Sequence, residues 1–121
     1  MADRIVLREL FAPLADRDWD ALAWQPFRPG IEIVSLYGGG QGADGPAAAL
    51  LRYAPGTQLT AHGHVDYEHI VVLSGDQRDE HGAYPAGSAL IHGAGTSHQV
   101  RSEQGCVVLA IWNAPVRFEQ G

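Results

Sequence analysis

The side chains best suited to binding a metal gather in the second half of the chain. All six histidines lie from position 62 to position 98. His62 and His64 are separated by one residue, so on a β-strand they would lie on the same face. Two imidazoles at that spacing can both reach one ion at about 2.0–2.1 Å. The pair therefore indicates metal binding, although His-x-His also occurs by chance on solvated strands.

Glu68 and His98 are the candidates that would complete such a site. Glu68 follows His64 by four residues: it has the same parity if the strand continues, and a short loop at residues 65–67 would also bring it to the same place. Its carboxylate would offset part of the charge of a dication in an apolar interior. His98 follows the tight turn Gly93-Ala94-Gly95 and would close the site from a neighbouring strand. Three imidazoles and one carboxylate suit one divalent transition metal: iron, zinc, nickel, manganese, copper or cobalt.

The elements that must position these residues are predicted to be strands. Glycine and proline interrupt the chain every 8–12 residues or so, a spacing typical of an all-β sandwich or barrel. Helix signals are weak, and only residues 16–24 offer a capped turn or two. We expect strands near residues 5–11, 31–37, 47–54, 57–63, 67–73, 77–82, 88–92, 97–102 and 105–112.

Two of these segments, 70–73 and 107–112, are apolar on both faces. If one face lines the interior of a small barrel, the other must also be covered. A second subunit would cover it, and we therefore expect a homodimer. Packing of one sheet of the same sandwich over the other explains the pattern equally well.

Composition excludes several classes of partner. The 121 residues suffice for one domain with one core, and the net charge of −6 disfavours binding to nucleic acid or to an anionic membrane. We find no apolar run near the ~20 residues that a membrane-spanning helix needs and no secretory signal pattern. Because Cys106 is the single cysteine, no internal disulfide can form, which fits a cytoplasmic protein.

The spacing of these residues resembles the motifs of the cupin family. Residues 56–75 fit the first cupin motif, G(X)5HXH(X)3-4E(X)6G, at every fixed position, from Gly56 to Gly75. The second motif, G(X)5PXG(X)2H(X)3N, fits residues 87–102 with two departures, Gly93 for proline and Ser102 for asparagine. The asparagine position is not a metal ligand in the family, so neither departure changes the ligand set. Both Gly56 and Gly75 are expected in hairpin turns with unusual φ.

The resemblance implies an RmlC-like cupin fold, a jelly-roll or double-stranded β-helix barrel. It also implies that the family's ligand positions correspond to His62, His64, Glu68 and His98. We expect residues 1–21 to form an N-terminal extension or an edge strand and residues 22–121 to form a single cupin barrel domain.

A narrower resemblance is to the cupin domain of the ChrR anti-sigma factors. It covers about residues 22–112 and is carried by residues 51–56, 79–87 and 102–106 and by Trp24 with Pro29-Gly30-Ile31. That group binds its sigma factor through a separate N-terminal zinc domain. Only about twenty residues precede the cupin here, without Cys or His. The resemblance therefore does not extend to anti-sigma activity.

Two functions remain open, and both involve a small-molecule ligand. Similar small cupins are dioxygenases that cleave diketone-like or hydroxyketone-like substrates with Fe(II). In that case Glu68 would be a labile fourth ligand or a base. The alternative is a non-catalytic module, resembling the ChrR cupin, that senses a ligand or redox state through its metal.

The remaining chemically active residues are expected outside the ligand set. On strand parity His69 faces away from Glu68, His92 would lie near the barrel mouth, and His81 would be exposed in a turn. Cys106 is expected to be a small buried hydrophobic residue. Candidates to line the pocket are Tyr53, Gln58 and Trp112.

Overall fold

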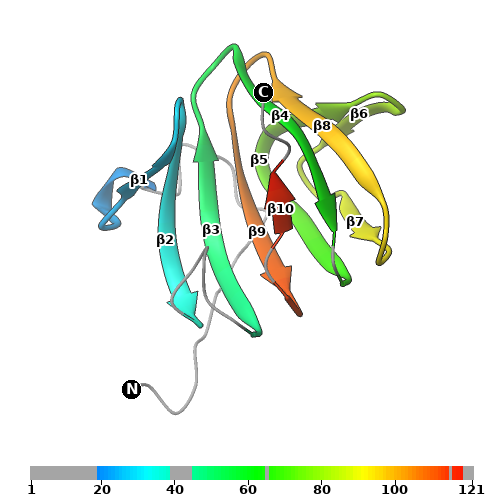
Figure 1. The fold of residues 1–121 in the computed structure, drawn as a ribbon. Helices are drawn as coiled ribbons and strands as arrows, with labels where there is room; N and C mark the ends of the chain where they lie inside the picture. Colours follow the sequence, from blue (N-terminus) through cyan, green and yellow to red (C-terminus); the bar gives the residue numbers. More distant parts are fainter. Residues whose placement is uncertain (1–18, 39–44, 65, 115, 119–121) are drawn as a thin grey trace.

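The computed structural model describes residues 19–38, 45–64, 66–114 and 116–118, which form antiparallel β structure with one short 3-10 turn, Trp19–Ala21 (Figure 1). The predicted strand at 5–11, and most of the predicted N-terminal extension, lie outside these residues. The strands are β1 (Gln25–Arg28), β2 (Ile31–Tyr37), β3 (Ala47–Tyr53), β4 (Thr57–His64), β5 (Glu68–Asp79), β6 (Gly82–Pro85), β7 (Ala89–His92), β8 (Ser97–Ser102), β9 (Cys106–Trp112) and β10 (Val116–Phe118).

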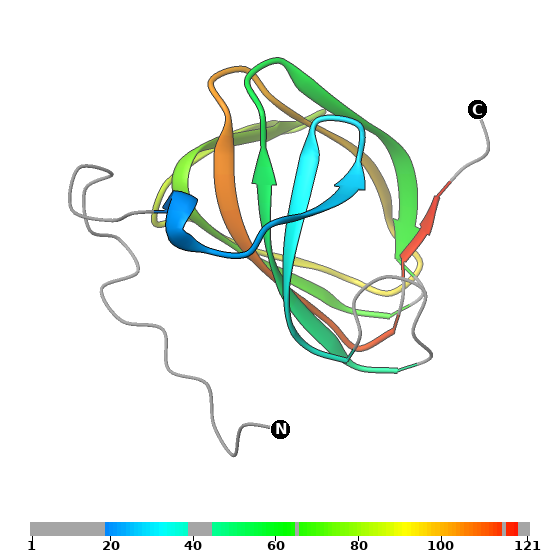
Figure 2. The ribbon, with the colours of Figure 1, turned by 90° about the vertical axis from the view of Figure 1, so that its left-hand side faces the viewer.

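The strands follow one another in the order β1-β2-β3-β9-β5-β8-β4-β10, and β6 and β7 also pair with β5. One half of this arrangement contains β1, β2, β3, β9 and β7, the other contains β6, β8, β4 and β10, and β5 belongs to both. The strands curve around a common interior (Figure 2). The all-β cupin barrel predicted from the sequence is therefore confirmed. No helix among the described residues is long and apolar enough to cross a membrane.

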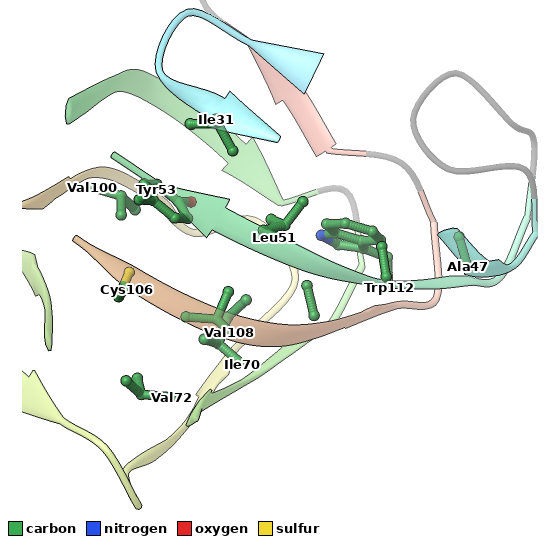
Figure 3. Packing of buried hydrophobic residues seen from close by; sticks show 12 residues of the cluster. Ile31, Ala47, Leu51, Tyr53, Ile70, Val72, Val100, Cys106, Val108 and Trp112 are labelled. Atoms are coloured by element: carbon green, nitrogen blue, oxygen red, sulfur yellow. The ribbon is translucent and has the colours of Figure 1, made fainter. Parts of the chain in front are cut away.

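The interior is filled by alternate residues of the strands. β8 has the regular pattern, with His98, Val100 and Ser102 buried and the residues between them exposed. On β9 the inward set is Cys106, Val108, Ala110 and Trp112, of which Val108 and Ala110 are fully buried. These side chains meet those of β2, β3 and β5 in one cluster (Figure 3). The core therefore surrounds the space into which the inward residues of β5 and β8 project.

The outer face of the β3, β9 and β5 strands has its own small apolar cluster. Leu50, Leu73 and Val107 are buried there, and Trp19 and Trp24 pack against them. Residues that precede β1 thus provide part of the cover that the apolar pattern of 107–112 requires. The homodimer stays a prediction.

The sequence pattern was wrong about the middle of β5. We expected two strands, 67–73 and 77–82, separated by a turn at Gly75-Asp76, but a single strand runs from Glu68 to Asp79. A register shift between Val72 and Ser74 marks a bulge, after which β5 leaves the first half of the barrel and pairs with β6 and β8. Bulges bend strands and let them pass from one sheet to another. The strands β1, β6 and β10, of three or four residues each, were also missed.

Gly75 is the residue that permits this passage. Its φ is +72°, and a Cβ there would lie 2.0 Å from the carbonyl oxygen of Gly105. The predicted unusual φ is confirmed for both Gly56 and Gly75, but neither lies in a hairpin. Gly56 joins β3 to β4, which are not paired with each other, and Gly75 lies inside β5.

We expect Gly75→Ala to lower the free energy of unfolding by more than about 2 kcal/mol. The added Cβ would clash with the backbone of Gly105, and alanine would be strained in the left-handed conformation of this position. Gly82→Ala is the matched control: the position is exposed, has no positive φ, and has no atom within 4 Å of an added Cβ. Urea unfolding of the metal-free proteins measures both. Equal stabilities of the two variants would contradict the assigned role of Gly75.

Candidate metal centre

Three inward-facing residues lie in a row across adjacent strands. Glu68 on β5 pairs with Trp112 on β9 at one side and with His92 on β7 at the other. Directly paired residues share a face of the sheet, with Cβ atoms about 4.5–5.5 Å apart. The Nε1–H of Trp112 donates a hydrogen bond to Oε2 of Glu68. Glu68 is 4% exposed, so its carboxylate is fixed inside the barrel.

His98 approaches this row from the other half of the barrel. Its Nε2 lies 4.0 Å from Oε1 of Glu68, and its ring centroid lies 4.1 Å from that of His92. Its Nδ1 faces a second carboxylate, Asp79, at 4.0 Å from Oδ2. The other oxygen of Asp79 accepts bonds from the Tyr84 hydroxyl and from the backbone N–H groups of His81 and Gly82. The imidazole of His98 therefore lies between two buried carboxylates.

The donor chemistry here fits a divalent metal. One ligand atom each from Glu68, His92 and His98 can be chosen so that all three lie within 4.8 Å of one another. Two imidazole nitrogens and one carboxylate oxygen are ligands of zinc and of most first-row transition metals. A carboxylate on the far side of a ligating imidazole, as Asp79 is placed toward His98, is the usual way to orient such a ligand. The barrel thus contains a group of residues that could hold one metal ion.

The predicted ligands on β4 are located by backbone register. His62 is the direct cross-strand partner of His98, and His64 pairs with Val116 of β10. The side chains of both histidines lie outside what the structure describes. Two of the four predicted ligands, Glu68 and His98, are therefore brought together by described side chains, and assignment of the other two stays a prediction.

Several further predictions can be compared with the structure. His81 is exposed and Cys106 is 4% exposed, as expected. Tyr53 and Trp112 line a cavity of about 20 Å³ together with Glu68 and His98, which confirms them as pocket residues. Gln58 lines a separate groove of about 280 Å³ near Asp79, Glu80, Gln99 and Arg101, so its predicted position in the central pocket was wrong.

The two departures from the second cupin motif are accommodated locally. Gly93 has no positive φ and its carbonyl accepts bonds from the N–H and the hydroxyl of Thr96, so the turn is kept. Ser102 is fully buried and donates its hydroxyl proton to the carbonyl oxygen of Asp76 on β5, 2.6 Å away. It therefore joins β8 to β5.

Sequence reasoning missed most of the environment of Glu68. It gave His92 no ligand role and did not single out Asp79. A signal for His92 was present, since its position immediately before the Gly93 turn is the end of a strand next to His98. No comparable signal existed for Asp79, because its inward direction depends on the bulge in β5.

Comparisons with known proteins identify the family of this chain. A family profile described as the ChrR cupin-like domain matches residues 15–115. The chain belongs to the ChrR cupin-like domain family. The anti-sigma-E factor ChrR of Cereibacter sphaeroides is 35% identical over 113 residues, which are 88% of this chain and 51% of that protein. The chain thus spans about half the length of this curated relative.

Solved structures show the same fold. The complex of SigE with the anti-sigma ChrR from Rhodobacter sphaeroides matches with a TM-score of 0.70 and 29% identity, over 89% of this chain and 61% of the other. An acetylacetone dioxygenase from Acinetobacter johnsonii matches with a TM-score of 0.73, over 99% of this chain and 79% of the other. Its identity to this chain is 13%, so this likeness concerns the fold alone.

Cys106 is not suited to redox chemistry of its own in the folded protein. Burial raises the pKa of its thiol from 9.0 to about 12. Because the thiolate is the reactive form, we expect alkylation of the native protein at pH 8 to be about a thousandfold slower than that of the unfolded chain. The raised pKa also means that the folded state loses stability as pH rises above 9, where the unfolded thiol ionises first. Iodoacetamide labelling followed by mass spectrometry measures this, and equal rates with and without denaturant would contradict it.

Proposed function

We propose that this protein is a metal-binding cupin module in which His62, His64, Glu68 and His98 hold one divalent transition metal that binds a small ligand. The observation that carries the proposal is the buried approach of the Glu68 carboxylate to the imidazole of His98. The register of His62 opposite His98 supports its inclusion, because cross-strand partners share a face. His64 lies two residues further along β4 and has the same parity.

The chain's own residues would prepare this site before the metal binds. Trp112 holds one oxygen of Glu68, which leaves the other directed toward His98. Asp79 lies on the Nδ1 side of His98, so it would stabilise a proton on Nδ1. Nε2 would then be the nitrogen left to bind the metal. When bound, the metal would supply a Lewis-acid centre, with electron transfer as well if it is redox-active.

The size of the cavity favours binding without turnover. Among the described residues, a cavity of about 20 Å³ adjoins Glu68, His98 and Trp112. This volume is room for one water-sized ligand. The rest of its lining is mainly apolar and is formed by Phe27, Leu51, Tyr53, Leu59, Ile70, Gln77 and Val100. A ligand of that size would bind at the metal. The protein would then act as a module that senses a ligand or a redox state. Membership of the ChrR cupin-like family is consistent with this choice.

A metal-dependent dioxygenase is the second candidate. It is favoured by the composition of the cluster formed by Glu68, His92 and His98, since two histidines and one carboxylate are the ligands of many non-haem Fe(II) oxygenases. A diketone-like or hydroxyketone-like substrate would have to displace part of the cavity wall. Glu68 would then be the residue with a catalytic role, as a labile ligand or a base.

Oligomeric state and cellular location also stay proposals. We propose a homodimer on the ground that the outer face retains apolar residues beyond the cover of Trp19 and Trp24, among them the exposed Ile91. We propose a cytoplasmic location because Cys106 is a free thiol.

We expect His62→Ala and His98→Ala each to weaken metal binding at least tenfold, because each removes one ligand from a four-ligand site. His81→Ala is the control, since His81 is exposed and outside the cluster. Competition with a chromophoric chelator under defined free zinc measures the dissociation constants. Unchanged affinity in both ligand variants would contradict the proposed ligand set.

Metal removal should destabilise the fold. An ion that binds only the native state contributes about 2.7 kcal/mol at 100 times its dissociation constant. We therefore expect the melting temperature to fall when a strong chelator removes the metal, and to be restored when metal is added back. Identical melting curves before and after confirmed removal would contradict a resident metal.

Oxygen consumption separates the two candidate functions. We expect the Fe(II)-loaded protein to take up no more O₂ in the presence of β-diketones, hydroxyketones or phenolic acids than in their absence. Glu68→Gln should mainly weaken metal affinity. Substrate-dependent O₂ uptake by the wild-type protein, lost in Glu68→Gln at full metal occupancy, would favour the dioxygenase over the binding module.

A further inference from the structure

His92 is a third donor beside Glu68 and His98, and neither cupin motif includes its position. It lies at the end of β7, where it pairs directly with Glu68. Its ring lies 4.1 Å from that of His98, centroid to centroid, with the planes inclined by 49°. Unlike Glu68 and His98, which are 4% and 6% exposed, His92 is half-buried. It therefore lies on the more open side of the cluster.

The spacing of the two rings suits ligands of one ion. Donor atoms about 2.0–2.2 Å from a metal lie about 3–4.4 Å from one another, and the atoms of this cluster lie within 4.8 Å. For two imidazoles bound at right angles, the ring centroids would be about 4.5 Å apart at such bond lengths. The observed 4.1 Å is close to this value. Because Nε2 of His98 lies 4.0 Å from Oε1 of Glu68, a side-chain shift of up to about 1 Å would let Glu68, His92 and His98 bind together.

We propose that His92 is an additional, exchangeable metal ligand that occupies the position an incoming small molecule takes. This rests on the proposed metal-binding function. Five protein donors would leave an octahedral ion one open position, and release of His92 would open a second. His92 is the member of the set suited to leave, because its strand has four residues, pairs with β5 alone among the described strands, and ends in a turn.

The occupant of the exchangeable position would be a small anion or neutral ligand with one or two donor atoms. The cavity of about 20 Å³ beside Glu68 and His98 has room for one water-sized group, and His92 is not part of its lining. Besides Glu68 and His98, the polar side chains of that lining are Tyr53, Gln77 and Trp112. Azide is a suitable probe, because it is a small anion that can bind a metal through one nitrogen.

The test compares the Co(II)-loaded wild-type protein with His92→Ala and His92→Phe. The Phe variant keeps the ring that packs beside His98 and serves if the Ala variant folds poorly. His69→Ala is the matched control, because His69 is the adjacent histidine on β5 and faces away from Glu68. The measurements are the Co(II) ligand-field spectrum, the Co(II) affinity by chelator competition, and the azide dissociation constant by spectral titration.

We expect the His92 variants to keep one Co(II) per chain with a more intense ligand-field spectrum, as the coordination number falls. Azide should bind them at least tenfold more tightly, because no side chain competes for the position. The His69 variant should match the wild type in both measurements. A wild-type spectrum and azide affinity in both His92 variants would overturn the proposal while leaving the metal site intact. Failure of the wild-type protein to bind Co(II) would instead overturn the proposed function.

Discussion

A carboxylate buried inside an apolar barrel constrains the rest of this structure. Glu68 is 4% exposed and is surrounded by the core residues of β3, β5, β8 and β9. Removing an ionised carboxylate from water costs several kcal/mol, and a hydrogen bond to a charged group returns about 1.5–3 kcal/mol. The indole N–H of Trp112 supplies one such hydrogen bond. His98 and His92 are the described groups placed beside this carboxylate to supply or to bind positive charge.

The geometry that brings these groups together depends on one irregular strand. Glu68 and Asp79 are eleven residues apart on β5, an odd separation that would place them on opposite faces of a regular strand. The bulge between Val72 and Ser74 adds one residue and restores a common direction. Both carboxylates consequently approach His98, one at each ring nitrogen. Gly75 allows this by passing against the backbone of Gly105, where no side chain would fit.

The two halves of the barrel contribute differently to the centre. β9, β5 and β7 supply a fixed row, in which Trp112 holds Glu68 and His92 stands at the open side. β8 and β4 supply His98 and the position of His62 opposite to it. A ligand that enters past His92 would thus meet a metal held from both halves. The two halves are joined through β5, through the Ser102 hydroxyl and through the shared core.

The sequence by itself determined the fold class, the family and two members of the centre. Turn spacing predicted short strands, and the spacing from His62 to Glu68 matches the first cupin motif. Parity also predicted His69 on the outer face, which the pairing of β5 agrees with. These features are local, and local spacing is what a sequence displays directly.

Tertiary structure alone decided what surrounds Glu68. The partners Trp112 and His92 lie 44 and 24 positions away along the chain, and they reach Glu68 because β9 and β7 pair with β5 in one register. Asp79 reaches His98 because of a bulge that the glycine pattern suggested as a turn. Strand register and strand irregularity arise from packing across the whole barrel, since a slip of one residue would turn every inward side chain outward. Such long-range choices leave no signature in the spacing of neighbouring residues.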